Sequence, residues 1–250
     1  MKAEAEFLLQ TMLRLLDGVP LTLSLAGLSV MAGGALAVVL TLLRRASPVL
    51  GALVRGYVFV LRGTPLLVQL FLIYYGLSQF PEVRHSALWP FLRQPYWCAI
   101  LAFTLNTAAY GSEILRGGLL AVPSGAIEAG QALGLSRLQV YRTITIPLAV
   151  RLALPAYGNE IIIMVKSTAL ASIVTLMDVT GIAAQLIADT FRAFEVFGCA
   201  GAIYLAINAA ITLSLHRLEA WLAIPVQAAS EAGPEVATTV PVPVPAMRPG

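Results

Sequence analysis

The stretch Gly18–Leu43, GVPLTLSLAGLSVMAGGALAVVLTLL, holds 26 residues without Asp, Glu, Lys or Arg. About 20 apolar residues in a helix cross the hydrocarbon core of a bilayer, and one central charge costs roughly 2.5–3.5 kcal/mol. The whole chain shares this character, because 58% of its 250 residues are hydrophobic and only 12% are charged. Soluble domains rarely have this composition, so the sequence indicates an integral membrane protein.

Uncharged runs of similar length predict further spans. Three of them are Gly63–Pro81, Gln94–Ser112 and Val196–His216. A fifth apolar region contains Glu160 and Lys166, and ionisable groups at membrane depth persist mainly where they face protein or a water-filled path. We therefore predict an all-α integral membrane protein whose five spans cover about 18–43, 63–81, 94–115, 147–177 and 196–216.

The arginines predict the orientation of these spans. Those in the loops after spans one and three are Arg44, Arg45, Arg55, Arg62, Arg116, Arg137, Arg142 and Arg151. The positive-inside rule places these loops and the C-terminus in the cytoplasm and the N-terminus outside. The net charge of +3 then follows from topology, and we expect no nucleic-acid partner.

The two ends of the chain differ from the spans. Residues 1–17 are predicted to lie on the external side, and the first span is too long for a cleavable signal peptide. The end of the chain, 221–250, includes alternating prolines at 241, 243 and 245, which favour extended polyproline geometry. We predict a disordered, Pro-rich cytoplasmic tail there.

The segment 123–147, between spans three and four, predicts two short helices joined at a glycine. Ser124 is expected to cap the first helix and Glu128 to lie in its early turns, where a carboxylate suits the positive end of the helix dipole. Ser136-Arg137-Leu138-Gln139 has the spacing of a capping box that opens the second helix. Gly134 lies between the two helices and permits a sharp bend.

The second of these helices runs toward Pro147. The proline ring removes an amide donor, so we expect Pro147 to kink or end the helix where span four begins. On spacing alone, an ordinary cytoplasmic connection and a docking element for a soluble partner are equally compatible with this segment.

The same segment resembles a known motif. Glu128-Ala129-Gly130, then Gly134, then Ile144-Thr145-Ile146-Pro147 are similar to the EAA loop of permease subunits from bacterial ATP-binding-cassette importers. The usual form of that loop has Ala where Gly130 stands and Leu where Ile146 stands. A glycine in the helix interior would weaken the first helix by up to about 1 kcal/mol.

Further motifs resemble the polar amino-acid branch of this family, and within it the permeases for histidine, lysine, arginine, ornithine and the arginine-related opines. The resemblance covers about residues 18–220, the predicted transmembrane domain. The motifs are Arg62–Leu70, Phe103–Tyr110, Arg116–Gly118, Val122–Pro123, Ala153–Glu160 and Lys166–Leu170.

The resemblance implies a multi-pass subunit of the bacterial inner membrane that pairs with an identical or homologous permease, an external substrate-binding protein and a cytoplasmic ATPase. The chain lacks the G-x-x-x-x-G-K-[ST] loop, and its two lysines are Lys2 and Lys166. We therefore expect no bound cofactor, no enzymatic activity of its own and ATP use by the partner. The residues that the resemblance places at the ATPase are Glu128, Ala129, Gly130, Gly134, Ile144 and Pro147.

Four residues, three of them ionisable, are candidates for the path of a polar, basic amino acid, because ionisable groups at membrane depth suggest function. They are Glu113, Asn159, Glu160 and Lys166. The alternative for each acid is a structural ion pair. Glu113 favours that alternative, because Arg116 lies three residues away on the same helical face. Glu160 and Lys166 are six residues apart, on roughly opposite sides of a regular helix, so both interpretations of Glu160 stay open.

Other residues receive structural interpretations. Arg62-Gly63-Thr64-Pro65 could form an anion-binding turn, but we favour a snorkelling arginine at the cytoplasmic interface followed by a helix-starting proline. The isolated His85 and His216 predict neither a metal site nor a catalytic base. An aromatic belt at the span ends would account for Tyr74, Tyr75, Trp89, Trp97 and Tyr204.

Two other function classes are less compatible with the sequence. An ion-coupled secondary amino-acid transporter would be expected to contain an internal repeat, and five spans do not divide evenly. The second class is an intramembrane enzyme or assembly factor. An enzyme needs a nucleophile and base or a metal site, and we recognise none in the sequence.

Overall fold

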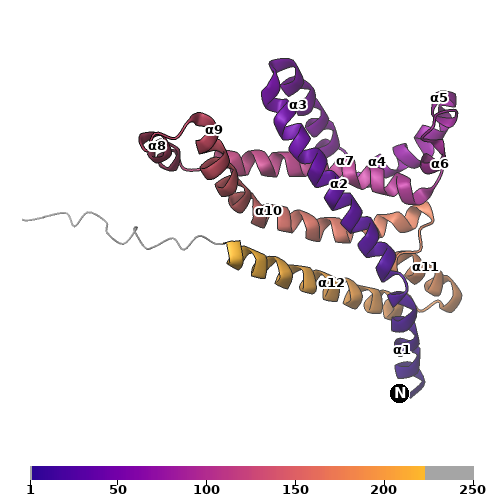
Figure 1. Ribbon diagram of the computed structural model, residues 1–250. Helices are drawn as coiled ribbons and strands as arrows, with labels where there is room; N and C mark the ends of the chain where they lie inside the picture. The colour runs from indigo at the N-terminus through magenta and orange to yellow at the C-terminus, as the bar shows by residue number, and fades with distance from the viewer. Residues whose placement is uncertain (1, 223–250) are drawn as a thin grey trace, which may run out of the picture.

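The computed structural model describes residues 2–222, and this part of the chain consists of helices and their connections (Figure 1). Four long helices form the body: α2 (Val19–Ala46), α7 (Pro95–Leu120), α10 (Ile146–Ser167) and α12 (Ala193–Leu222). Helix α10 lies between α7 and α12, and α2 crosses this layer with its main contact on α7. The all-α prediction is confirmed for the described residues.

Five spans agree with the structure if one of them is bent. Helical runs long and apolar enough to cross a membrane cover Lys2–Ala46, Pro95–Leu120, Arg137–Val174 and Ala193–Leu222. The fifth candidate joins α3 (Pro48–Gly63) to the run Leu66–Gln79, which consists of α4 (Leu66–Phe71), η1 (Leu72–Gly76) and η2 (Leu77–Gln79). The runs Lys2–Ala46 and Ala193–Leu222 extend beyond their predicted limits at both ends, because helices continue past the first charged residue.

The second predicted span, 63–81, contains the helical run Leu66–Gln79 but omits α3, the other half of the bent pair. The two segments meet at 106°. Pro65 causes the break, since a proline disfavours helical geometry in the residue before it, and Thr64 is extended (φ −115°, ψ 145°). Charge counting missed α3 because Arg55 and Arg62 interrupt its apolar residues.

The helix does not end at Pro147, which was one of the two outcomes predicted there. Helices α9 (Arg137–Val140), η3 (Tyr141–Thr145), α10 and η4 (Thr168–Val174) follow one another without a break. In η3 the Ile146 N–H donates to the Tyr141 carbonyl, five residues back. Pro147 then stands in the first turn of α10, where a missing N–H costs little.

The shorter helices lie at the ends of the long ones. Helices α5 (Pro81–Arg84) and α6 (Trp89–Leu92) precede α7, and α8 (Ser124–Ala132) follows it at the opposite side of the molecule (Figure 1). The N-terminal segment 1–17 contains α1 (Lys2–Leu16), which contacts α11 (Val179–Thr190) and α12. Trp221 and Leu222 belong to α12 rather than to the predicted tail, and the remainder of that tail lies outside the described residues.

Small residues let the long helices approach closely. A Cβ on Gly33 of α2 would lie 2.7 Å from the Thr107 Cβ of α7, and one on Gly118 of α7 would lie 2.6 Å from the Ala149 carbonyl oxygen of α10. Such contacts matter in a membrane, where lipid is as apolar as the side chains and helix association depends on close packing.

A buried acid, Asp178, joins α11 to α12. The Asp178 carboxylate caps α11 by accepting from the Gly181 N–H (2.9 Å) and also accepts from the Tyr204 hydroxyl (3.0 Å). Burial raises the pKa of Asp178, against the opposing effect of these hydrogen bonds. The interpretation of Tyr204 as an aromatic-belt residue was therefore wrong, because its hydroxyl serves a buried network.

We expect Gly118→Ala to lower the thermal unfolding midpoint of the purified protein, because the new Cβ meets backbone rather than a movable side chain and overpacking costs about 1–3 kcal/mol. The neighbouring Gly117 is the control. A Cβ there meets nothing within 4 Å, and Gly117→Ala should be neutral or slightly stabilising. Equal midpoints for the two variants would contradict this packing.

Candidate functional site

A cavity lies where the bend between α3 and α4 faces α7 and α10. Its volume is about 700 Å³. Both charged and neutral polar groups line it, and they come from three separate parts of the chain: Arg62, Thr64, Asn106, Tyr110, Asn159, Glu160 and Ser167. The cavity therefore combines a cation, an anion and several amide or hydroxyl groups.

A buried polar network holds the bend that forms one wall. The Gln69 amide nitrogen donates to the carbonyls of Leu61 (2.7 Å) and Thr64 (3.0 Å), and its amide oxygen accepts from the Asn106 side chain (3.1 Å). Gln69 and Asn106 are both buried. Carbonyls at the end of α3 lack helical partners, so Gln69 satisfies groups that the break at Pro65 exposes.

Arg62 and Glu160 are the charged groups of the cavity. The Arg62 guanidinium lies 4.9 Å from the centre of the Tyr110 ring, in the range of a cation–π contact. Glu160 is only 5% exposed. Its carboxylate interacts electrostatically with the positive charge of Arg62. Arg62 is exposed and also lines the cavity, and its interpretation as a snorkelling interface residue stays a prediction.

A hydrogen bond to α2 fixes the rotation of α10 about its own axis, and with it the helix face that is turned to the cavity. The Tyr157 hydroxyl donates to the Val30 carbonyl of α2 (3.1 Å). A side chain on Gly34 would collide with that hydroxyl, since its Cβ would overlap the oxygen. This anchor, two and three residues before Asn159 and Glu160, directs both toward the cavity.

The other two path candidates lie outside this cavity. Glu113 forms ion pairs with Arg44 of α2 and with Arg116 (2.7 Å). The i,i+3 ion pair expected from the sequence is thus present, and Arg44 extends it to a second helix. Lys166 is exposed and forms no ion pair within residues 2–222. Glu160 and Lys166 do not pair, as their spacing predicts.

The segment between α7 and α10 folds as two helices with a glycine between them. Gly134 has a φ of +81°, which other residues adopt at a cost of roughly 1–2 kcal/mol. The capping box at the start of α9 is confirmed, because Ser136 and Gln139 exchange both bonds (3.4 and 2.8 Å). The predicted cap at Ser124 was wrong: α8 begins there, after Pro123, without a side-chain cap.

This elbow, residues 124–145, has an inner and an outer face. Gly130 is buried, and a Cβ on it would lie 2.5 Å from the Ile144 Cδ1. Glycine at 130 therefore makes room for Ile144, which the resemblance alone did not explain. Glu128 and Ala129 are exposed, as is Leu133 at 83%.

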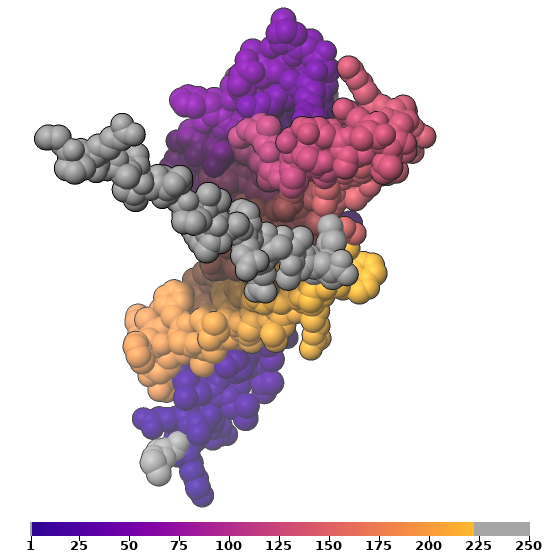
Figure 2. Space-filling model, turned by 90° about the vertical axis from the view of Figure 1, so that its left-hand side faces the viewer, coloured from indigo at the N-terminus to yellow at the C-terminus, as the bar shows by residue number. Residues whose placement is uncertain are grey.

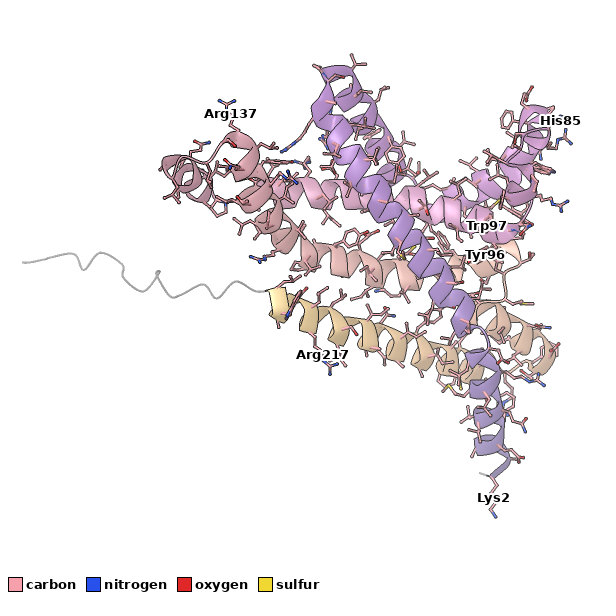
Figure 3. All side chains as sticks on the ribbon, viewed as in Figure 1. Lys2, His85, Tyr96, Trp97, Arg137 and Arg217 are labelled. Atoms are coloured by element: carbon pink, nitrogen blue, oxygen red, sulfur yellow. The ribbon has the colours of Figure 1, made fainter. Side chains whose placement is uncertain are left out.

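The exposed face of the elbow is accessible in this chain. Figure 2 looks onto the end of the molecule that carries α8 and α9 and shows them as a lobe standing out from the body. Figure 3 shows Arg137 of α9 pointing outward, while His85 lies near α5 at the opposite side. No group of His, Cys, Asp and Glu among residues 2–222 could hold a metal ion.

Comparison with known proteins gives a consistent result. The model of a family described as "Binding-protein-dependent transport system inner membrane component" matches residues 28–224. The octopine transport system permease protein OccM of Rhizobium radiobacter is 57% identical over 83% of this chain and 85% of the relative. The arginine ABC transporter permease protein ArtM of Haemophilus influenzae is 43% identical over 82% and 90%, respectively.

A solved structure supports the same relationship. A chain in the crystal structure of an amino acid ABC transporter with histidines superposes with a TM-score of 0.75 and 33% sequence identity. The match covers 83% of this chain and 94% of the other. The fold is thus that of a known transporter architecture.

We expect Gln69→Leu to lower the thermal unfolding midpoint, because it leaves the Leu61 and Thr64 carbonyls short of donors and such losses cost about 1–3 kcal/mol. Gln79→Leu is the matched control, since Gln79 is exposed and only weakly bonded to the Tyr75 carbonyl (3.4 Å). A Gln69→Leu midpoint no lower than that of the control would show that the bend does not need this network.

Proposed function

The chain belongs to the family of inner membrane components of binding-protein-dependent transport systems, and on that premise we propose that it conducts basic amino acids or opines. It is a permease component of an ATP-binding-cassette importer. The alternative of an ion-coupled secondary transporter finds no support in the family match. Cargo, partners and residue roles are inferred below from the geometry.

The charged groups that line the cavity support the proposed cargo. Arginine and octopine, for which the two relatives are named, both carry a guanidinium group and carboxylate. A buried carboxylate at Glu160 complements the guanidinium, and Arg62 complements a carboxylate by bidentate hydrogen bonding. Asn106 of α7 and Asn159 of α10 add neutral polar groups to the lining.

We assign the path to Glu160 and Asn159 rather than to all four candidates. Both line the cavity, whereas Glu113 is engaged by two arginines and Lys166 points elsewhere. A cation that enters from water must lose hydration, and an acid held ready in a protein-lined space offsets part of that cost. Arg62 keeps Glu160 from standing as an isolated buried charge.

The elbow is proposed to contact a separate ATPase that uses the ATP. Glu128 and Ala129 lie on its exposed face, while Gly130 and Ile144 pack inside it and Gly134 forms the turn. Because α9, η3 and α10 are continuous, a displacement of the elbow would reach Pro147 and then the cavity helix as a rigid movement.

The remaining assignments follow from the importer class. We propose an external binding protein at the α5 and α6 side and a second permease, identical or homologous, beside this chain. The elbow and C-terminus would face the cytoplasm and the N-terminus the outside, in a bacterial inner membrane. Exposed apolar residues along α2 and α12, such as Met31 (74%) and Leu205 (72%), suit lipid or that second permease.

Purification in mild detergent, followed by mass spectrometry of the subunits, tests the assembly. A stoichiometric ATPase is the expected companion, and a second permease sequence would identify a heterodimer. Uptake of radiolabelled arginine and octopine into proteoliposomes containing the whole complex then tests the cargo. Transport of neither compound, in a complex that hydrolyses ATP when its binding protein is loaded, would contradict the cargo assignment.

Glu160→Gln should reduce uptake of a cationic substrate by about tenfold or more, since one charge-assisted contact is worth roughly 1.5–3 kcal/mol. The affinity of the external binding protein should stay unchanged. Lys166→Gln removes a charge from the same helix outside the cavity and serves as the control. Equal uptake by both variants would remove Glu160 from the path.

Gly134→Val should uncouple ATP hydrolysis from uptake, because a β-branched residue resists the positive φ of the elbow. The measurement is the number of substrate molecules imported per ATP in proteoliposomes. Gly125→Ala, in the first turn of α8 and with nothing within 4 Å of a Cβ, should leave that ratio unchanged. An unaltered ratio in Gly134→Val would contradict the coupling role.

A further inference from the structure

A second polar hollow lies between α2, α3 and α7, apart from the substrate cavity. Its volume is about 290 Å³. Four arginines line it: Arg44, Arg45, Arg55 and Arg116. Arg44 and Arg116 share the single carboxylate of Glu113, and Arg45 and Arg55 form no ion pair within residues 2–222. The hollow therefore carries an excess of three positive charges.

An apolar hollow adjoins this cluster. It lies between α2, α7 and the start of α10, has a volume of about 150 Å³, and is lined by Val38, Leu115 and Val150 among others. The two hollows share Thr41 and Leu119 as lining residues. A cationic space and an apolar space thus meet along the same pair of helices.

Arg45 links the two hollows directly. It lines the cationic hollow, and its Nη1 donates to the hydroxyl of Tyr141 (3.2 Å), which lines the apolar one. Tyr141 belongs to η3, the wide turn between the elbow and α10. Anything bound across both hollows would contact the helical run that carries the elbow.

We propose that these two hollows together bind an anionic phospholipid, with the phosphate among the arginines and an acyl chain in the apolar hollow. Guanidinium groups bind phosphate oxygens by paired hydrogen bonds, and basic pockets between transmembrane helices bind acidic lipid headgroups. A free phosphate would leave the apolar hollow unused. A zwitterionic lipid would bring no net negative charge to the excess of arginines.

The ligand has a consequence for coupling. A lipid phosphate beside Arg45 would compete for the donor that now reaches Tyr141, or complete its hydrogen bonding. In either arrangement the lipid would change the contacts of Tyr141 in η3, the turn through which the elbow connects to α10. This inference does not depend on which substrate the protein transports.

The test is native mass spectrometry of the complex released from nanodiscs that contain equal amounts of phosphatidylglycerol and phosphatidylcholine. The first variant is Arg45→Gln with Arg55→Gln, which spares the Glu113 ion pairs. Its control is Arg84→Gln with Arg93→Gln, an equal charge change at exposed positions near α5 and α6. Binding of inorganic phosphate to the detergent-purified complex is measured in parallel.

A second pair of variants tests the apolar half. Val38→Trp fills the apolar hollow, and Met31→Trp places the same side chain on an exposed position of α2 that lines neither hollow. Val38→Trp should reduce phosphatidylglycerol retention without changing phosphate binding. This pair, with the lipid competition in the unaltered protein, decides the question even if the arginine variant fails to fold.

The unaltered protein should retain phosphatidylglycerol over phosphatidylcholine by about tenfold or more, and Arg45→Gln with Arg55→Gln should remove most of that preference. The Arg84 and Arg93 control should keep it. Equal retention of the two lipids, or equal loss in both arginine pairs, would overturn the proposal. Tight phosphate binding together with no effect of Val38→Trp would also overturn it, in favour of a site for a small anion.

Discussion

The cavity lined by Arg62 and Glu160 depends on the satisfaction of backbone carbonyls at the bend between α3 and α4. In an apolar environment, an irregular backbone is tolerated only where protein or a water-filled space supplies partners for its polar groups. Gln69 supplies them to Leu61 and Thr64, and Asn106 of α7 orients Gln69 in turn. The same bend places Arg62 among the residues that line the cavity. One buried amide network therefore shapes the cavity wall and positions the arginine on it.

The two acids of the central helices illustrate how context separates structural from functional charge. Glu113 is surrounded by two arginines and fastens α2 to α7. Glu160 is more deeply buried and lines a cavity of about 700 Å³. A paired acid has its interactions satisfied, whereas an acid that borders a cavity can exchange water for a ligand. This contrast is the reason for proposing Glu160, rather than Glu113, as a residue of the path.

The elbow combines rigidity with an exposed face. Its stiffness comes from the capping box at Ser136 and from the contact of Gly130 with Ile144, and its bend comes from Gly134. The departure from alanine at 130, a weakness by helix propensity alone, is accommodated by the larger side chain against it. The neighbouring η3 connects this unit both to α10 and to the arginine-lined hollow.

Composition and spacing determined much of this protein. Uncharged runs located the spans that contain α2, α7 and α12, the capping box at Ser136 and the ion pair of Glu113 with Arg116 followed from local spacing, and the motifs around Glu128 and Pro155 indicated the family. The tertiary structure alone decided the network that supports the bend and the bonding of Tyr204. Both depend on contacts between residues far apart in the chain, Asn106 with Gln69 and Tyr204 with Asp178. A local pattern records helix length and charge, but the partner of a buried polar group is set only when distant helices pack together.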